Sequence, residues 1–296
     1  MIDNRIKVSV VMGVYNQWDR KGLLQAVKSI LNQTLTEFEF IIYDDGSYRE
    51  LRAYIQDLAK LDKRIKVFGR EQNHGLAFSL NACISCAKGK YIARMDADDV
   101  SHPSRLQVQY DFLEAHPEYA WCGCNTKLFD ADGEWGCREM PECPMPTDYL
   151  RFSPYVHPSV MYRSEIFEEN VGYLDSKETL RCEDYEIFMR LCQMGLKGYN
   201  IQRYLFSYRE DHESYKRREF IHRWNESKLR FKSFKKMHIL FPIGWLYVLR
   251  PIIAGLIPTY IIAWVKHRES QNTEMSYRSV KWNDEQKIAD IQRYTQ

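Results

Sequence analysis

Three aspartates in the run MDADD, at Asp96, Asp98 and Asp99, have the types and spacing that most directly suggest chemistry. They follow a short strand-like run, KYIA, at residues 90–93. In an extended segment alternate side chains face the same way, so Asp96 and Asp98 are expected to point together. Carboxylates suit Mg²⁺ or Mn²⁺, which usually share their other positions between water and substrate phosphates. Acidic residues also end strands as ordinary turn formers, so the pair alone does not establish a metal site.

The first hundred residues alternate between strand-like and helical patterns. β-Branched and apolar runs predict strands at residues 7–15, 38–44, 65–69 and 90–95. Apolar residues at helical spacing predict helices at 22–31, 49–61, 76–87 and 103–115. Strands separated by helices indicate β-α-β units around a sheet buried on both faces. The predicted fold class is therefore α/β, a Rossmann-like, mostly parallel sheet flanked by helices.

Polar residues cluster at the predicted strand ends, where α/β sheets usually bind ligands. They are Tyr15 and Asn16 after the first strand, Asp44, Asp45, Gly46 and Ser47 after the second, Arg70, Asn73 and Gly75 after the third, and the aspartates after the fourth. Each group alone is a weak signal, because D-D-G-S is also ordinary turn chemistry. Together they favour a crevice for a nucleotide and a metal.

The middle of the chain is less regular. Residues 119–208 show short strand-like runs, proline-containing loops and a helix at 183–194. Glu183 and Asp184 begin that helix, and acids in a first helical turn usually complement the helix dipole. Taken alone, this pair indicates no function.

Composition and charge limit the classes of protein to which the chain can belong. The chain has 296 residues, 45% hydrophobic and 28% charged, enough to bury one large domain or two smaller ones. Residues 205–268 carry 13 Lys and Arg against 5 Asp and Glu, a formal +8, which leaves −6 for the rest of a chain of net charge +2. This asymmetry suggests a basic segment that meets an anionic surface. The N-terminal residues lack the architecture of a secretory signal, which predicts a cytosolic protein.

The eight cysteines are expected to be reduced thiols in such a compartment. Cys83 and Cys86 lie three apart in an apolar helical stretch, which predicts that both face the core. Buried small hydrophobes are favoured over a structural zinc site for these two and for the remaining candidates, Cys122, Cys124, Cys137 and Cys143.

The C-terminal part changes character. Residues 216–236 carry nine basic residues against two acids on a helical pattern, and an apolar stretch follows at 239–268. That stretch is long enough to span a bilayer, but its prolines and Arg250 favour two shorter segments. Trp245, Tyr247, Tyr260 and Trp264 suit an interface. We therefore expect a basic, aromatic-rich platform on the cytoplasmic membrane face. A true span and a hydrophobic dimer or core helix remain alternatives. Nucleic-acid binding is not favoured, because the basic helix contains no recognised nucleic-acid-binding motif.

Five blocks, read in order, resemble a known family. They are VSVVMGVYN, FEFIIYDDGS, NHGLAFSLN, KGKYIARMDADD and CEDYEIFMRL. They are similar to the inverting nucleotide-sugar glycosyltransferases of family 2, GT-A-fold enzymes of bacterial capsule, exopolysaccharide and O-antigen assembly. The resemblance covers roughly residues 8–209. It implies a GT-A domain at 1–210, with a nucleotide-sugar-binding half at 1–100 and an acceptor half at 101–210. A helical, membrane-associating extension at 211–296 follows.

The resemblance also implies roles for individual residues, with a UDP-hexose type of donor and a glycan or polyprenyl-linked acceptor. Asp184 matches the catalytic base of the family. Asp98 and Asp96 match the residues that bind Mn²⁺ or Mg²⁺. The nucleotide-sugar would contact Val14, Tyr15, Asn16, Asp44, Asp45, Arg70, Gly75 and Asp96. His157 and Glu183 would border the acceptor or the diphosphate. One departure is Gly13, where the family commonly has proline.

Two other readings share parts of this pattern. A nucleotidyltransferase would need a glycine-rich, basic loop after the first strand, whereas this chain has VYNQWDRKG there. A noncatalytic scaffold on the same fold would be expected to lack the D-x-D or the E-D acids, and both are present. The sequence does not specify the donor sugar, the acceptor, the linkage or the oligomeric state.

Overall fold

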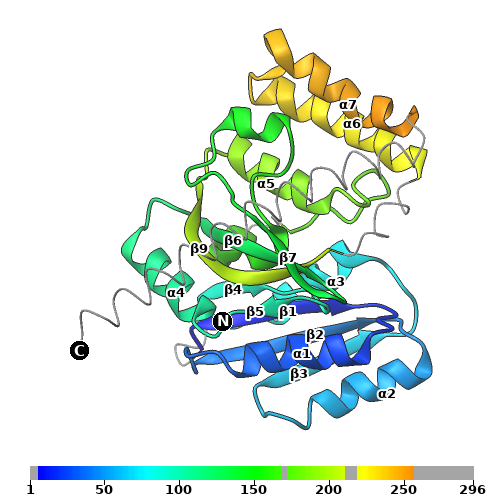
Figure 1. The fold of residues 1–296 in the computed structure, drawn as a ribbon, viewed down its shortest axis with the longest axis vertical. Coiled ribbons are helices and arrows are strands. Elements are labelled where there is room, and N and C mark those ends of the chain that lie inside the picture. Colours follow the sequence, from blue (N-terminus) through cyan, green and yellow to red (C-terminus); the bar gives the residue numbers. More distant parts are fainter. Residues whose placement is uncertain (1–5, 169–171, 211–218, 257–296) are drawn as a thin grey trace.

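The fold is an α/β sheet whose two faces are covered by different sets of helices (Figure 1). The computed structural model describes residues 6–168, 172–210 and 219–256. Strands and helices alternate at first: β1 (Val8–Val14), α1 (Arg20–Leu31), β2 (Phe38–Asp45), α2 (Arg49–Leu58), β3 (Ile65–Arg70), α3 (Leu76–Cys86) and β4 (Tyr91–Arg94). Then follow β5 (Val100–Ser101), α4 (Arg105–Ala115), β6 (Trp121–Asp130), β7 (Gly133–Arg138), β8 (Met161–Arg163), α5 (Glu183–Gln193), β9 (Gly198–Arg209), α6 (Phe220–Lys236) and α7 (Trp245–Leu256).

The sheet has the strand order β3-β2-β1-β4-β8-β6-β9-β5, with β7 paired to β6. The pairs β2–β3, β1–β2 and β1–β4 are parallel, as predicted. Beyond β4 the sheet is mixed, because β8 runs antiparallel to both β4 and β6. The four parallel strands therefore end at one edge, and chain order reverses across β1. Crevices that bind ligands form at such an edge.

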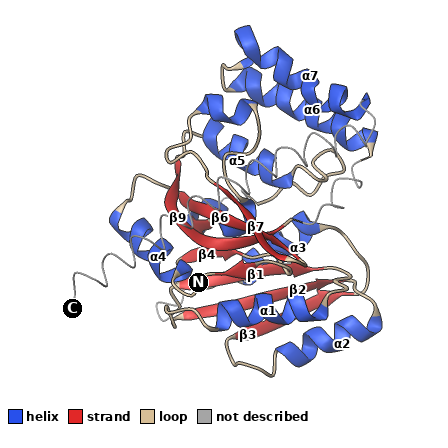
Figure 2. Ribbon diagram, viewed as in Figure 1, coloured by secondary structure: helices blue, strands red, loops and turns tan. Residues whose placement is uncertain are grey.

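Alternation along the strands builds two cores. Val8, Val10 and Met12 of β1 face one core, whereas Val11 faces the other. The first core contains residues of α1, α2 and α4, and the second contains residues of α3, α5, α6 and α7. Strands buried on both faces must be apolar throughout, which is why their sequences read as continuous hydrophobic runs. Figure 2 shows the helices on either side of the strands.

The middle of the chain contains longer strands than expected. β6 has 10 residues and β9 has 12, and they pair in parallel with irregular register near Asn125. The prediction of short strands was wrong because polar residues interrupt their apolar pattern. The prediction of buried cysteines was also wrong for Cys86 and for Cys143, which is exposed in the loop after β7, and Cys137 is only half-buried. Cys83 is buried but Cys86 is exposed, because it lies at the end of α3.

The helices α6 and α7 form a hairpin that packs on α5 (Figure 1). Arg230 of α6 is 4% exposed, donates to the Leu150 carbonyl oxygen at 2.8 Å and lies 4.8 Å from the Tyr185 ring centre. Glu226 balances its charge at 2.8 Å. None of the described helices is long and apolar enough to cross a membrane. The rest of the predicted apolar stretch, residues 257–268, lies outside the described residues.

Candidate active site

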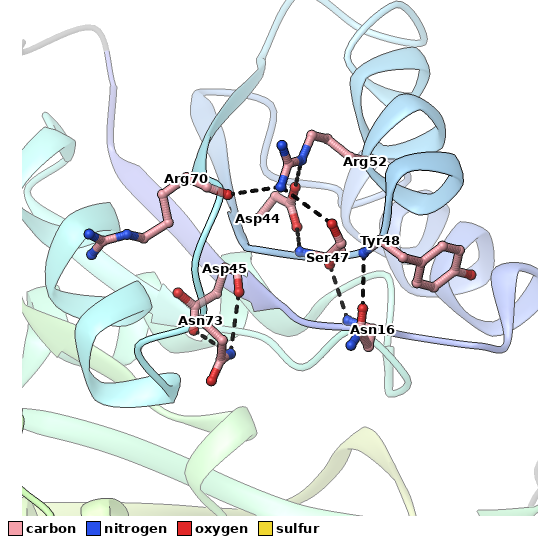
Figure 3. Close-up of polar contacts among 8 residues, drawn as sticks. All are labelled: Asn16, Asp44, Asp45, Ser47, Tyr48, Arg52, Arg70 and Asn73. Carbon is pink, nitrogen blue, oxygen red and sulfur yellow. Dashed lines mark hydrogen bonds and ion pairs between the residues drawn. The ribbon is translucent and has the colours of Figure 1, made fainter.

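The loops after β1 and β2 are joined by the side chain of Asn16. Its backbone N–H donates to Ser47 Oγ at 3.1 Å, and its Oδ1 accepts from the Tyr48 N–H at 3.0 Å (Figure 3). Asn16 has a φ of 46°, a left-handed conformation that asparagine tolerates better than most residues. The predicted nucleotide residue is thus part of the scaffold that fixes these two loops.

Asp44 stabilises the loop after β2 from within. Its Oδ1 accepts from the Ser47 N–H at 3.0 Å, and its Oδ2 accepts from Arg52 Nε at 3.2 Å. Arg52 also donates to the carbonyl oxygens of Ser47 and Arg70 (Figure 3). Asp44 is only 2% exposed, so its carboxylate shapes the loop.

Asp45 holds the loop that precedes α3. Its Oδ2 accepts from Asn73 Nδ2 at 2.8 Å and from the Gly75 N–H at 2.7 Å. The His74 N–H lies 3.1 Å from each carboxylate oxygen. A carboxylate has about four acceptor positions, so Oδ1, with one such contact, has spare acceptor capacity, although the residue is as buried as Asp44, at 2% exposed. Gly75 has a φ of +98°, and a Cβ there would meet nothing within 4 Å, so this backbone is both strained for other residues and open to a ligand.

Half-buried Arg70 and exposed Tyr15 are the remaining candidates on the nucleotide side. The Arg70 guanidinium lies 4.4 Å from the Phe78 ring centre, a cation–π contact that presents a flat surface. Tyr15 is 52% exposed beyond β1. The side chain of Val14 lies in the core, so only its backbone can reach a nucleotide. Gly13 is explained by packing, because a Cβ there would lie 3.0 Å from Ser79 Cβ of α3.

The three aspartates converge after β4. Carboxylate oxygens of Asp96, Asp98 and Asp99 all lie within 4.8 Å of one another. The strand ends at Arg94, so a turn rather than the predicted extended segment brings these residues together. Burial raises the pKa of Asp98 to about 6, and the charge of Asp96 adds to this rise. Burial and both neighbouring carboxylates raise the pKa of Asp99 well above its ordinary value.

Two arginines flank this cluster. Arg94 is 3% exposed, and its Nη1 lies 2.5 Å from Asp96 Oδ2. The Arg209 N–H donates to Asp99 Oδ1 at 2.7 Å, while its Nη1 lies 2.6 Å from Asp19 Oδ2. Arg209 therefore connects the acid cluster to the start of α1, which Asp19 caps through the Gly22 N–H.

The cluster suits a hard divalent cation. Asp99 Oδ2 is buried with no hydrogen-bond partner, and a buried carboxylate oxygen without a donor is costly. A cation would supply that partner, and oxygen donors are those that Mg²⁺ and Mn²⁺ prefer. Asp96, Asp98 and Asp99 are the only such acidic, histidine or cysteine group among the described residues.

Asp184 approaches the same region from α5. It is half-buried in the first turn of that helix. Burial raises the pKa of Tyr173 to about 12, with the negative charges of Asp184 and Asp96 adding to the rise and Arg94 opposing it. Asp184 and Asp96 thus both act on one hydroxyl, although they lie on opposite halves of the chain. The predicted base and one member of the acid cluster therefore both lie near enough to Tyr173 to affect it electrostatically.

Of the other two predicted residues of this half, His157 is buried, whereas Glu183 is half-buried like Asp184. His157 is 7% exposed, and its Nε2 lies 2.7 Å from the Tyr173 hydroxyl. Burial, followed by Arg94, holds the pKa of His157 well below its usual value, so its ring is neutral. It lies behind Tyr173 rather than at an open acceptor surface. Burial also raises the pKa of Glu183.

Sequence reasoning did not assign roles to Arg94, Tyr173 and Arg209. A signal existed for Arg94, because a charged residue in an otherwise buried strand needs a partner, and acids follow two residues later. Tyr173 lies in an irregular loop and carried no such signal. Arg209 is placed by β9, whose length was underestimated.

Proteins with similar sequences align with this chain over most of its length. EpsE of Bacillus subtilis (strain 168) is 35% identical over 258 residues, 86% of this chain and 91% of that protein. The O-antigen biosynthesis glycosyltransferase WbnJ of Escherichia coli is 29% identical, over 70% of this chain and 81% of its own. The amylovoran biosynthesis glycosyltransferase AmsE of Erwinia amylovora is 26% identical, over 88% and 98%.

Solved structures share the fold. Staphylococcus aureus TarS, crystallised with UDP-GlcNAc, has a TM-score of 0.62 at 16% identity and covers 85% of this chain and 72% of the TarS chain. The mannosyltransferase PcManGT of Pyrobaculum calidifontis, in complex with GDP-Man and Mn²⁺, has a TM-score of 0.61 at 14% identity and covers 90% and 81%. The predicted GT-A fold is confirmed by these likenesses.

The family model described as "Glycosyl transferase family 2" matches residues 9–170, more than half of the chain. This range includes the loops after β1 to β4 and the acid cluster. Together with the relative that is 35% identical, it shows that the chain belongs to glycosyl transferase family 2.

Proposed function

We propose that this chain transfers a hexose, with inversion, from a UDP-sugar to a glycan or lipid-linked saccharide in bacterial surface polysaccharide assembly. The observation that carries the proposal is the cluster of Asp96, Asp98 and Asp99, whose carboxylate oxygens lie within 4.8 Å of one another, with Asp184 and Asp96 both in electrostatic range of Tyr173. Displacing a nucleoside diphosphate from a sugar needs a proton acceptor on one side of the anomeric carbon. It needs charge stabilisation for the leaving diphosphate on the other.

The chain's own residues divide these tasks. Asp184 takes the proton of the acceptor hydroxyl as that oxygen attacks, and a single attack inverts the anomeric centre, by analogy with single-displacement glycosidases. Asp96 and Asp98, joined by Asp99, would hold Mn²⁺ or Mg²⁺. When bound, the cation neutralises charge that develops on the leaving diphosphate.

The donor and acceptor classes rest on the site and on similar proteins. Arg70 on Phe78 offers a flat cationic surface to a base, and Asp45 Oδ1 can accept one more hydrogen bond, as a uracil N–H would donate. Structures with UDP-GlcNAc and with GDP-Man share the fold, so a nucleotide-sugar donor is the class we propose. WbnJ and AmsE are named for polysaccharide assembly, which supports an acceptor of that kind.

We also propose that the protein works at the inner face of the cytoplasmic membrane. The hairpin of α6 and α7 exposes aromatic and aliphatic side chains beside lysines, an arrangement suited to an anionic bilayer surface. Its exposed apolar residues are Phe220, Ile221, Trp224, Phe231, Phe241, Ile243, Trp245, Leu246, Leu249 and Ile253.

A donor panel tests the central proposal. The purified chain is incubated with UDP- and GDP-sugars, Mn²⁺ and bacterial membranes, and released nucleotide is measured. Asp184→Asn should lose about 10²–10⁴-fold in transfer, the usual value of general-base help, while UDP still binds in calorimetry. Asp111→Asn, the same substitution at an exposed carboxylate of α4, is the control and should retain most activity. If Asp184→Asn kept more than a tenth of the native rate, Asp184 would not be the base.

A further inference from the structure

A groove lies between α5, α6 and the loop of residues 174–179, apart from the crevice at the strand ends. It encloses about 250 Å³, room for several waters at about 30 Å³ each. It is lined by Leu174, Ser176, Glu178, Thr179, Glu186, Arg190, Gln193, Asn225, Lys228, Leu229, Lys232, Ser233 and Lys236. The α5 residues among these lie after Asp184 in the chain, so the groove adjoins the helix that carries the proposed base.

The groove has a surplus of positive charge. Lys228, Lys232 and Lys236 recur at every fourth position of α6 and all line it. The acid Glu186 is neutralised by Arg190, whose Nε lies 2.7 Å from its Oε1. Glu178 is the second acid of the lining, so four cationic and two acidic residues leave the groove a formal charge of +2. Among the described residues, no carboxylate pairs with any of the three lysines. Like charges four apart on a helix destabilise it, a cost that a bound anion would remove.

An ordinary explanation covers only part of this pattern. Lysines in the last helical turn complement the helix dipole, which accounts for Lys236 and for Lys235. It does not account for Lys228, two turns earlier, or for why the three share a cavity with the Ser176 hydroxyl. Hydroxyl and ammonium groups around one cavity are donors suited to phosphate oxygens.

The lysines also adjoin an exposed apolar surface. At 3.6 residues per turn, Trp224 and Phe231 lie on the face of α6 next to the lysine row. Lys228 Nζ is 5.9 Å from the Trp224 ring centre, and Phe231 is 5.2 Å from Trp245 of α7. Trp224 and Phe231 are 44% and 39% exposed. Aromatic side chains beside a basic groove match the boundary of a bilayer, where lipid phosphates lie.

We propose that this groove binds the phosphate group of an anionic membrane lipid, with Lys228, Lys232 and Lys236 as its ligands. The proposal rests on the membrane association put forward above, and it adds a defined site to that association. A lipid phosphate held here would fix the hairpin, and therefore α5, relative to the membrane that carries the acceptor.

Vesicle binding by the full chain tests the site. Neutral phosphatidylcholine vesicles are compared with vesicles that also contain phosphatidylglycerol or polyprenyl phosphate, and inorganic pyrophosphate is titrated as a soluble source. Lys232→Gln should weaken binding to phosphate-bearing vesicles about tenfold or more, as loss of a charge-assisted hydrogen bond does. Lys235→Gln is the matched control, because Lys235 is an equally charged, exposed residue of α6 outside the groove. The affinity of the Lys235→Gln variant for phosphate-bearing vesicles should fall about fivefold or less.

The outcomes separate the two proposals. Equal losses in the two variants, with vesicle binding otherwise intact, would mean diffuse surface attraction and would overturn the groove site alone. Failure of the native chain to bind any phosphate-bearing vesicle would overturn both the site and the membrane association. Binding of pyrophosphate but not of vesicles would overturn the lipid source. Thermal unfolding of each variant checks that the hairpin is intact.

Discussion

At the scale of single residues, the acid cluster makes the effect of a cation depend on pH. A buried carboxyl whose pKa is about 6, as for Asp98, binds more protons when folded than when unfolded, where its pKa is about 3.9. Folding stability from this group is therefore present at low pH and is lost as pH rises from about 4 through 6. A divalent cation binds the deprotonated form and offsets that loss.

We therefore expect Mn²⁺ to raise the midpoint of thermal unfolding more above pH 6 than below pH 5. The measurement is thermal unfolding with and without Mn²⁺ across this range. Asp98→Asn should flatten the dependence, and Asp148→Asn, a carboxylate in an exposed helical turn, should leave it unchanged. A cation effect independent of pH in the native chain would argue against this cluster as the binding site.

In the absence of a cation, Arg94 supplies the positive charge that balances the acid cluster. Arg94→Met should destabilise the cation-free protein by about 3 kcal/mol, because breaking a buried pair leaves carboxylates uncompensated. The same variant should gain more stability from Mn²⁺ than the native chain, since Arg94 no longer competes for Asp96 Oδ2. Denaturant unfolding with and without Mn²⁺ measures both effects. Arg94→Lys keeps the positive charge, so its stability and its response to Mn²⁺ should lie between those of the native chain and those of Arg94→Met. An unchanged response to Mn²⁺ would contradict this role.

The residues of this site were predictable to different degrees. The aspartates could be identified only together with the polar residues at the other strand ends, because acids after a strand are also ordinary turn formers. The role of Asp99 could not, since its orphaned Oδ2 and its contact with the Arg209 N–H depend on how β9 passes the cluster. Tyr173 likewise gains its place from His157 and Asp184, which only the folded chain brings near.

At the scale of elements, the loop before α3 depends on one carboxylate. Asp45→Asn replaces an acceptor of three N–H donors with a group that is itself half donor. The loop at 73–75 should loosen, at a cost of about 1–3 kcal/mol for unsatisfied buried groups. Binding of UDP should weaken, as measured by calorimetry. Lys60→Ala, which removes an exposed ion pair with Asp57 on α2, should change neither quantity measurably. Unchanged UDP affinity in Asp45→Asn would exclude this loop from the nucleotide site.

Helices and strands were predicted well where the apolar residues follow a single period, either helical or strand-like. The four parallel strands and α1 to α4 lie where apolar alternation and helical spacing place them, within a few residues. The mixed part was harder because its pairing is non-local. β8 has three residues and takes its place between β4 and β6 from partners distant in sequence. No local pattern encodes such pairing.

At the scale of the whole molecule, contacts between distant segments join the start of α1 to the end of β9, and the C-terminal hairpin to α5. Asp19 at the start of α1 pairs with Arg209 at the end of β9, and Arg230 of α6 covers Tyr185 next to Asp184. The sequence predicted a basic, apolar C-terminal region but not these contacts, because long side chains reach partners that composition cannot specify. The hairpin is therefore packed against the helix that carries the proposed base.

The hairpin's apolar surface supplies the last prediction. Phe241 and Leu246 are 74% and 69% exposed, and inserting each into a bilayer interface would stabilise binding by about 1.5–3 kcal/mol at most. Phe241→Ser with Leu246→Ser should reduce partition into anionic vesicles at least about tenfold and leave thermal unfolding nearly unchanged. Leu61→Ser, at a 51% exposed residue after α2, is the control and should bind vesicles as the native chain does. Equal binding by all three proteins would show that α6 and α7 do not face the membrane.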